Sequence, residues 1–151
     1  MPVALALHLV AAVVWVGGMF FAYMALRPAA ASMEPAQRLP LWSRTFGRFF
    51  PWVWAAVIAL PATGYWMIIH AFGGMAHAGL RINIMQTLGI IMIMLYLHVF
   101  FAPYRRMNHA IAAGDFAAAS KQLAQIRRLI GINLLIGLAT ITVASAGRYW
   151  H

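Results

Sequence analysis

The chain has 151 residues, of which 64% are hydrophobic, 9% are charged and none is cysteine. A soluble domain averages about 25% charged residues, so this composition and a mean hydropathy of +0.81 indicate an integral membrane protein. The absence of cysteine excludes disulfides, thiolate metal sites and iron–sulfur clusters. With only Glu34 and Asp115 as carboxylates, paired-carboxylate catalysis is excluded as well.

Four apolar runs are long enough to cross a bilayer core of about 30 Å as helices. They cover residues 3–26, 49–72, 82–102 and 129–147, and the first three contain one histidine each. Arg27-Pro28 is expected to end the first span and Pro103 the third, whereas Pro61 inside the second predicts a kink. Residues 28–47 are expected to form an inner loop. We predict one all-α domain over residues 1–151, a four-helix up-down bundle.

The net charge of +9 reflects basic residues whose positions predict the membrane topology. Nine of the eleven basic residues fall in two connections, and only Arg81 and Arg148 lie on the other side. The positive-inside rule therefore predicts that both termini lie outside, and no nucleic-acid patch is expected. The first span is expected to be a retained helix rather than a signal peptide, because it has no basic n-region.

Aromatic residues gather at the predicted span ends, Tyr149 and Trp150 among them, as in an interfacial belt. After the third span, a helix is expected to end at Gly114. Asp115 should then cap a helix that continues into the fourth span.

Histidines inside a membrane are costly to place and therefore candidates for function. From the outer span ends, His8 and His70 are expected to lie at similar depth, so that facing helices could direct both imidazoles at one ion or cofactor. His98 lies near the inner end of the third span, one turn from Met94. It is either a structural or relay residue or part of a second, inner site.

The predicted outer loop combines His70 with Met75 and His77, and Met67 lies one turn before His70. Thioether and imidazole ligands together suit Cu(I). In the first span, a stripe of His8, Ala11, Trp15, either Gly18 or Met19, and Ala22 repeats at helical spacing. Its tryptophan is either a wall for a planar cofactor or part of the core. Span four carries small and polar residues on one face, which are expected to pack within or between chains.

The segment Ala6-Leu7-His8-Leu9-Val10-Ala11-Ala12-Val13-Val14-Trp15-Val16-Gly17-Gly18-Met19 resembles the first helix of the CopD-like family, membrane proteins associated with copper resistance and uptake. Thr63-Gly64-Tyr65 and the set Arg127, Arg128, Gly131, Asn133 and Leu134 are weaker matches. The resemblance implies a protein of a bacterial inner membrane, with periplasmic termini, that binds copper through His8, His70, Met75 and His77. Met67 is a further candidate ligand, and His98 with Met94 is the candidate for a second, inner station. A metallochaperone or redox partner and a homo-oligomer are expected possibilities.

The same helix resembles HemJ-type protoporphyrinogen oxidases, which bind b-type haem through an equivalent histidine, here His8. Those enzymes carry a lysine near the start of the third span, where this chain has Arg81. The alternative prediction is therefore a b-type cytochrome. Its axial ligands would be His8 and His70, with Trp15 beside the ring and Arg81 or Arg148 at the propionates. We expect no catalytic residues; if the protein were an enzyme, it would be a haem-linked membrane oxidoreductase.

Overall fold

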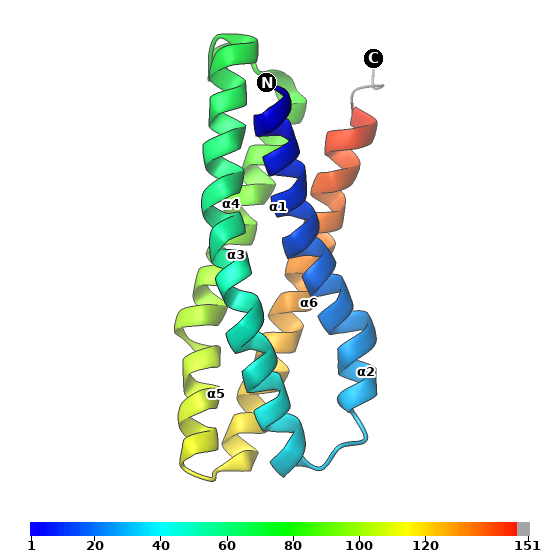
Figure 1. Cartoon of the computed structure of the whole chain (residues 1–151), viewed down its shortest axis with the longest axis vertical. Helices are drawn as coiled ribbons and strands as arrows, with labels where there is room; N and C mark the ends of the chain where they lie inside the picture. The colour runs from blue at the N-terminus through cyan, green and yellow to red at the C-terminus, as the bar shows by residue number, and fades with distance from the viewer. Residues whose placement is uncertain (148–151) are drawn as a thin grey trace.

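A computed structural model describes residues 1–147, which form helices, short connections and no strand. The elements are α1 (Pro2–Phe21), the π-helical η1 (Ala22–Leu26), α2 (Arg27–Ala30), α3 (Pro35–Phe72), the 3-10 helix η2 (Met75–His77), α4 (Gly79–Phe101), α5 (Pro103–Ala112) and α6 (Phe116–Ala146). They stack into four long helical columns that run up and down in one bundle (Figure 1). We call the end where α1 begins and α3 ends the N-terminal end, and the opposite one the arginine-rich end.

Each column is long and apolar enough to cross a membrane. The four candidate spans within residues 1–147 are Pro2–Ala30, Pro35–Phe72, Gly79–Ala112 and Phe116–Ala146. Many large apolar side chains point away from the bundle; Val13, Ile58 and Leu135 are all more than two thirds exposed. Exposed apolar area of this kind is what a lipid-facing surface requires. The predicted four-span, multi-pass membrane fold is confirmed.

Two predictions about the connection between the first two spans are wrong. The first helix does not end at Arg27-Pro28, because η1 shifts the hydrogen-bond register just before this proline and α2 continues to Ala30. The expected loop over residues 28–47 is also wrong, since only residues 31–34 separate α2 from α3. Pro35 occupies the first turn of α3, where no backbone donor is needed. Pro40, Pro51 and Pro61 lie inside α3, where tertiary packing outweighs the single backbone bond that each removes.

The second connection at the arginine-rich end follows the prediction closely. Helix α4 ends at Phe101, and α5 begins at Pro103. After α5, Gly114 adopts a positive φ of 71°, which a glycine tolerates without strain. The Asp115 side chain accepts a hydrogen bond from the Ala118 amide at 3.1 Å and so caps α6. The predicted stop and cap are confirmed.

The core is dominated by aromatic residues on the arginine-rich side of the bundle. Phe46 and Phe50 of α3 stack with ring centroids 5.1 Å apart, and Phe50 meets Tyr96 and Tyr104 edge to face. The predicted inward stripe of α1 is confirmed, because Trp15 and Met19 are each 3% exposed. Gly18 lets α3 approach, since a Cβ there would overlap the Phe49 ring. The histidines and methionines of interest lie mostly toward the other end.

Candidate functional site

His8 is anchored at the interface of α1 and α3. Its Nδ1 lies 2.8 Å from the Thr63 hydroxyl, which in turn donates to the Ala59 carbonyl at 2.6 Å. Because the hydroxyl has given its proton to that carbonyl, it acts as the acceptor toward the imidazole. The His8 proton is therefore on Nδ1, and the lone pair of Nε2 is left for a ligand.

Gly64 completes the seat of this imidazole. A Cβ at this position would lie 3.4 Å from His8 Cε1 and 3.8 Å from Nδ1, which is ordinary van der Waals contact, so the backbone of α3 lies directly beside the ring. The next residue, Tyr65, accepts a hydrogen bond from Gln86 Nε2 of α4 at 2.7 Å. Thr63-Gly64-Tyr65 thus connects α3 to two neighbouring helices. Sequence reasoning singled out this motif without assigning Thr63 and Gly64 to His8.

His70 lies near the end of α3 and is exposed. Its Nδ1 is 2.8 Å from the Trp66 carbonyl, one helical turn earlier, and its ring stacks on the Trp66 ring at 4.2 Å with an interplanar angle of 22°. Since a carbonyl can only accept, this Nδ1 also carries the proton. His70 therefore also presents Nε2 outward in a fixed orientation.

The two imidazoles do not lie level with each other. His8 pairs with Thr63, and His70 is seven residues further along α3, which is about 10 Å along the helix axis. The predicted similar depth therefore needs correction. It assumed that α1 and α3 end at the same height, whereas α3 extends beyond the start of α1. The structure does not bring His8 and His70 together on one ion.

The residues do not fit a porphyrin between His8 and His70. Two axial nitrogens on one iron must face each other across a ring, which an axial offset of about 10 Å prevents. Trp15 does face the interior, as predicted, but it lies two turns below His8 and packs edge-on against Tyr96 at 6.2 Å. The cavity lined by Trp15 and Tyr96 has a volume of about 20 Å³, which is room for one water molecule.

The loop after α3 brings the other predicted donors to the N-terminal end. Gly73 and Gly74 have φ angles of 71° and 123°, and Gly74 N donates back to the Ile68 carbonyl at 3.3 Å. This turn leads into η2, which packs against α3 and carries Met75 and His77, both exposed. Two imidazoles and a thioether, those of His70, Met75 and His77, are therefore presented to solvent at one end of the bundle.

Met67 links this end to His8. It lies four residues after Thr63 and three before His70, so Thr63, Met67 and His70 share one face of α3. Thr63 contacts His8 from this face, and Met67 is half-buried. We call His8, Met67 and His70 the seam. Within residues 1–147 no group of three or more histidines and carboxylates could hold a metal.

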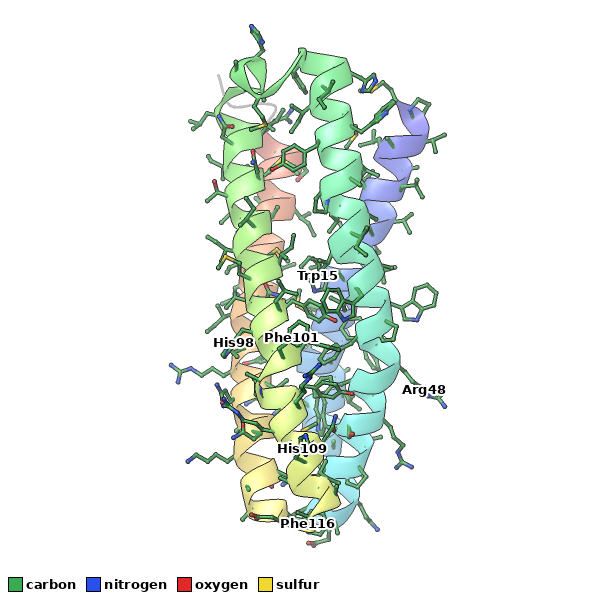
Figure 2. All side chains as sticks on the ribbon, turned by 90° about the vertical axis from the view of Figure 1, so that its left-hand side faces the viewer. Trp15, Arg48, His98, Phe101, His109 and Phe116 are labelled. Carbon is green, nitrogen blue, oxygen red and sulfur yellow. The ribbon has the colours of Figure 1, made fainter. Side chains whose placement is uncertain are left out.

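The remaining predicted site residues lie elsewhere. Arg81 Nη1 donates to the Ala144 carbonyl of α6 at 3.3 Å, so it joins two helices. Met94 is 65% exposed, and His98, one turn later, is also exposed and lies at the margin of the bundle (Figure 2). Neither points into the core. Arg148 lies outside the described residues, as do Tyr149 and Trp150.

Asn133 is the one buried polar side chain of the described core. It is 5% exposed, its Nδ2 donates to the Met92 carbonyl at 3.2 Å, and its Oδ1 has no partner among the described residues. Asn133 lines the same small cavity as Trp15 and Tyr96. The predicted packing role of span four is supported by this bond and by Gly137, where a Cβ would be 2.9 Å from Val16 Cγ2.

Comparison with known proteins gives one match. The model of the family described as Copper resistance protein D matches residues 43–146, which is more than half of the chain. The match includes Thr63-Gly64-Tyr65, Met67, His70, Met75 and His77, whereas α1 with His8 precedes it. No curated protein and no solved structure matches. The chain therefore belongs to the copper resistance protein D (CopD) family.

Proposed function

We propose that this membrane protein binds copper through imidazole and thioether ligands at its N-terminal end, for copper uptake or handling. The observation that carries the proposal is the seam with the adjoining loop: His70, Met75 and His77 at the surface, and Met67 and His8 below them. Membership of the CopD family supports copper as the metal. The chemistry of the donors supports it independently, because soft thioethers combined with imidazoles favour Cu(I).

The loop is suited to capture the ion. His70, Met75 and His77 are exposed, so a copper donor can reach them directly. The glycine pair before Met75 lets the loop adjust to the ion, whereas His70 is already oriented by Trp66. We propose that copper binds first here. Nine of the eleven basic residues fall in the two connections at the arginine-rich end. This distribution supports an extracytoplasmic location of the N-terminal end in a bacterial inner membrane.

The seam offers a second position inside the membrane. From His70, the donors follow α3 downward to Met67 and then cross to the free Nε2 of His8. The bond from His8 to Thr63 sets the tautomer that a metal ligand needs, as an outer partner of a ligating histidine does. We propose that copper passes from the loop to His8. Met94 and His98 face away from the core and are not part of this route.

The test is Cu(I) titration of the detergent-purified protein under anaerobic, reducing conditions, against a competing chelator of known affinity. We expect stoichiometric binding that weakens by about tenfold or more, or 1.4 kcal/mol, in each of His70→Ala, His77→Ala and Met75→Leu. His8→Ala should remove the deeper site and leave capture by the loop. Matched controls are His98→Ala, His109→Ala and Met94→Leu, which carry the same substitutions outside the site.

Two results would overturn the proposal. The first is equal loss of Cu(I) affinity in the control variants and the site variants. The second is an intense Soret band in the protein as purified that shifts on reduction and disappears in His8→Ala, because this would identify haem as the ligand.

A further inference from the structure

Three arginines from three separate elements lie at the arginine-rich end, where the charges of two of them act on the third. Arg27 begins α2, Arg38 lies near the start of α3 and Arg127 lies on α6. The charges of Arg27 and Arg38 both act on the partly buried Arg127 guanidinium. We call these residues the arginine triad. A purely topogenic role would place basic residues in this region without requiring their charges to act on one another.

The triad is held in place by neighbouring groups. The Arg27 guanidinium lies over the Tyr23 ring at 4.8 Å, and that ring packs on α6, where a Cβ at Gly131 would be 2.8 Å from it. Arg38 Nη1 donates to the Met33 carbonyl at 3.3 Å, which ties it to the connection before α3. Arg38 Nε is buried and has no partner among residues 1–147. The side chains are therefore positioned, but their donors are not all used.

No carboxylate charge among the described residues acts on Arg127. The groups whose charges act on Arg127 are Arg27, Arg38 and Tyr23. The chain has only two carboxylates. Asp115 is engaged in capping α6, and Glu34, four residues before Arg38 at the start of α3, is not among the groups that act on Arg127. Close like charges with an unpaired buried donor are unfavourable unless an anion joins them. By contrast, Arg48 is exposed and projects from α3 away from the bundle (Figure 2).

Two features of the triad indicate which anion it binds: its depth in the membrane and the geometry of its guanidinium donors. The triad lies where the apolar part of the bundle gives way to its basic end, and basic residues that flank a membrane span are typical of the headgroup region. Guanidinium groups bind phosphate oxygens in a forked, charge-assisted geometry. Basic sites between helices at this level are typical binding sites for anionic lipid headgroups.

We infer that Arg27, Arg38 and Arg127 bind the phosphodiester headgroup of an anionic phospholipid, which holds the η1–α2 segment against α6. The inference does not depend on copper binding, since the triad lies at the end of the bundle opposite the seam. It assigns a ligand to residues that otherwise serve only to orient the chain.

The test compares phosphatidylglycerol with zwitterionic phosphatidylcholine. The variant R27Q/R38Q/R127Q removes the triad, and R44Q/R48Q/R106Q removes the same charge from exposed positions at the same end. In the wild type and the control, added phosphatidylglycerol should raise the melting temperature above the phosphatidylcholine value. In the triad variant the apparent affinity for phosphatidylglycerol should fall by about 100-fold, three cationic contacts at roughly fivefold each.

The single variant R127Q is the check if the triple variant misfolds, because it leaves the Arg38 bonds intact; we expect about a fivefold loss of affinity. Equal losses in the exposed-arginine control would mean that binding follows net charge, which overturns the inference. Water-soluble glycerol phosphate added to the detergent-solubilised protein separates the two sources of phosphate. Stabilisation equal to that by phosphatidylglycerol would identify a free phosphate ligand and overturn the lipid assignment.

Discussion

The bond between His8 and Thr63 provides the sharpest test of the seam. Thr63→Val keeps the shape of the side chain but removes the acceptor 2.8 Å from His8 Nδ1. An interhelical hydrogen bond in a membrane protein contributes about 0.6 kcal/mol on average. When the ring N–H is left unsatisfied in a part-buried position, the total cost rises to about 1–3 kcal/mol. We therefore expect a loss of about 1–3 kcal/mol in unfolding by SDS.

Thr140→Val is the matched control. Its hydroxyl donates to the Ile136 carbonyl at 2.8 Å within α6, in the same way as Thr63 bonds to Ala59, but no histidine depends on it. It should unfold like the wild type. In Thr63→Val, the Cu(I) affinity of the His8 position should fall about 10–100-fold, as for loss of the outer partner of a ligating histidine.

Nitrogen-15 NMR of His8 provides a direct check on the cause. In the wild type the proton should be on Nδ1, and in Thr63→Val the two tautomers should become mixed. A wild-type His8 protonated at Nε2 would refute the reasoning. Equal losses of stability in Thr63→Val and Thr140→Val would refute it too, because only one of these hydroxyls joins two helices.

Three further predictions concern the bundle, and SDS unfolding measures each. Gly18→Ala should lower the free energy of unfolding by about 1–3 kcal/mol, because the new Cβ would overlap the Phe49 ring. Gly17→Ala is the control: the space around Gly17 is open, so this change should raise the free energy of unfolding by up to about 1 kcal/mol. Equal effects of the two substitutions would contradict the packing of Gly18 against Phe49. Asp115→Ala should cost about 1 kcal/mol through the lost cap, and an unchanged protein would mean that α6 does not depend on it. Asn133→Leu should change the free energy of unfolding by less than about 1 kcal/mol, because it removes an unpartnered oxygen along with one hydrogen bond. A larger loss would indicate that a bound water satisfies that oxygen.

The spans and the cap of α6 were predictable because their causes are local. A run of about 20 apolar residues must be buried in lipid or protein, whatever its neighbours are. Asp115 after a glycine stops one helix and starts the next through bonds within a few residues. The inward face of α1 was predictable for the same reason, since Trp15 and Met19 repeat at helical spacing.

The prolines of α3 and the partner of His8 were not predictable in this way. Proline rules are local, but Pro40 and Pro51 lie beside Leu39, Trp42 and Phe50, whose burial stabilises the helix across them. The pairing of His8 with Thr63 depends on how far α3 slides past α1, and no pattern within one helix encodes that offset. An error of a few residues in relative height was enough to predict a shared site for His8 and His70.

The distribution of donors along the bundle favours holding copper at the N-terminal end over conducting it through the core. Imidazole and thioether groups follow the seam down to His8, two helical turns above Trp15. Below that point Trp15 and Tyr96 close the interior, and the cavity beside them, about 20 Å³, offers one unpartnered amide oxygen, that of Asn133. A Cu(I) ion that left His8 for that oxygen would exchange soft ligands for a hard one. Transfer to a partner at the exposed loop requires no such exchange, because the loop and the seam present the same ligand types.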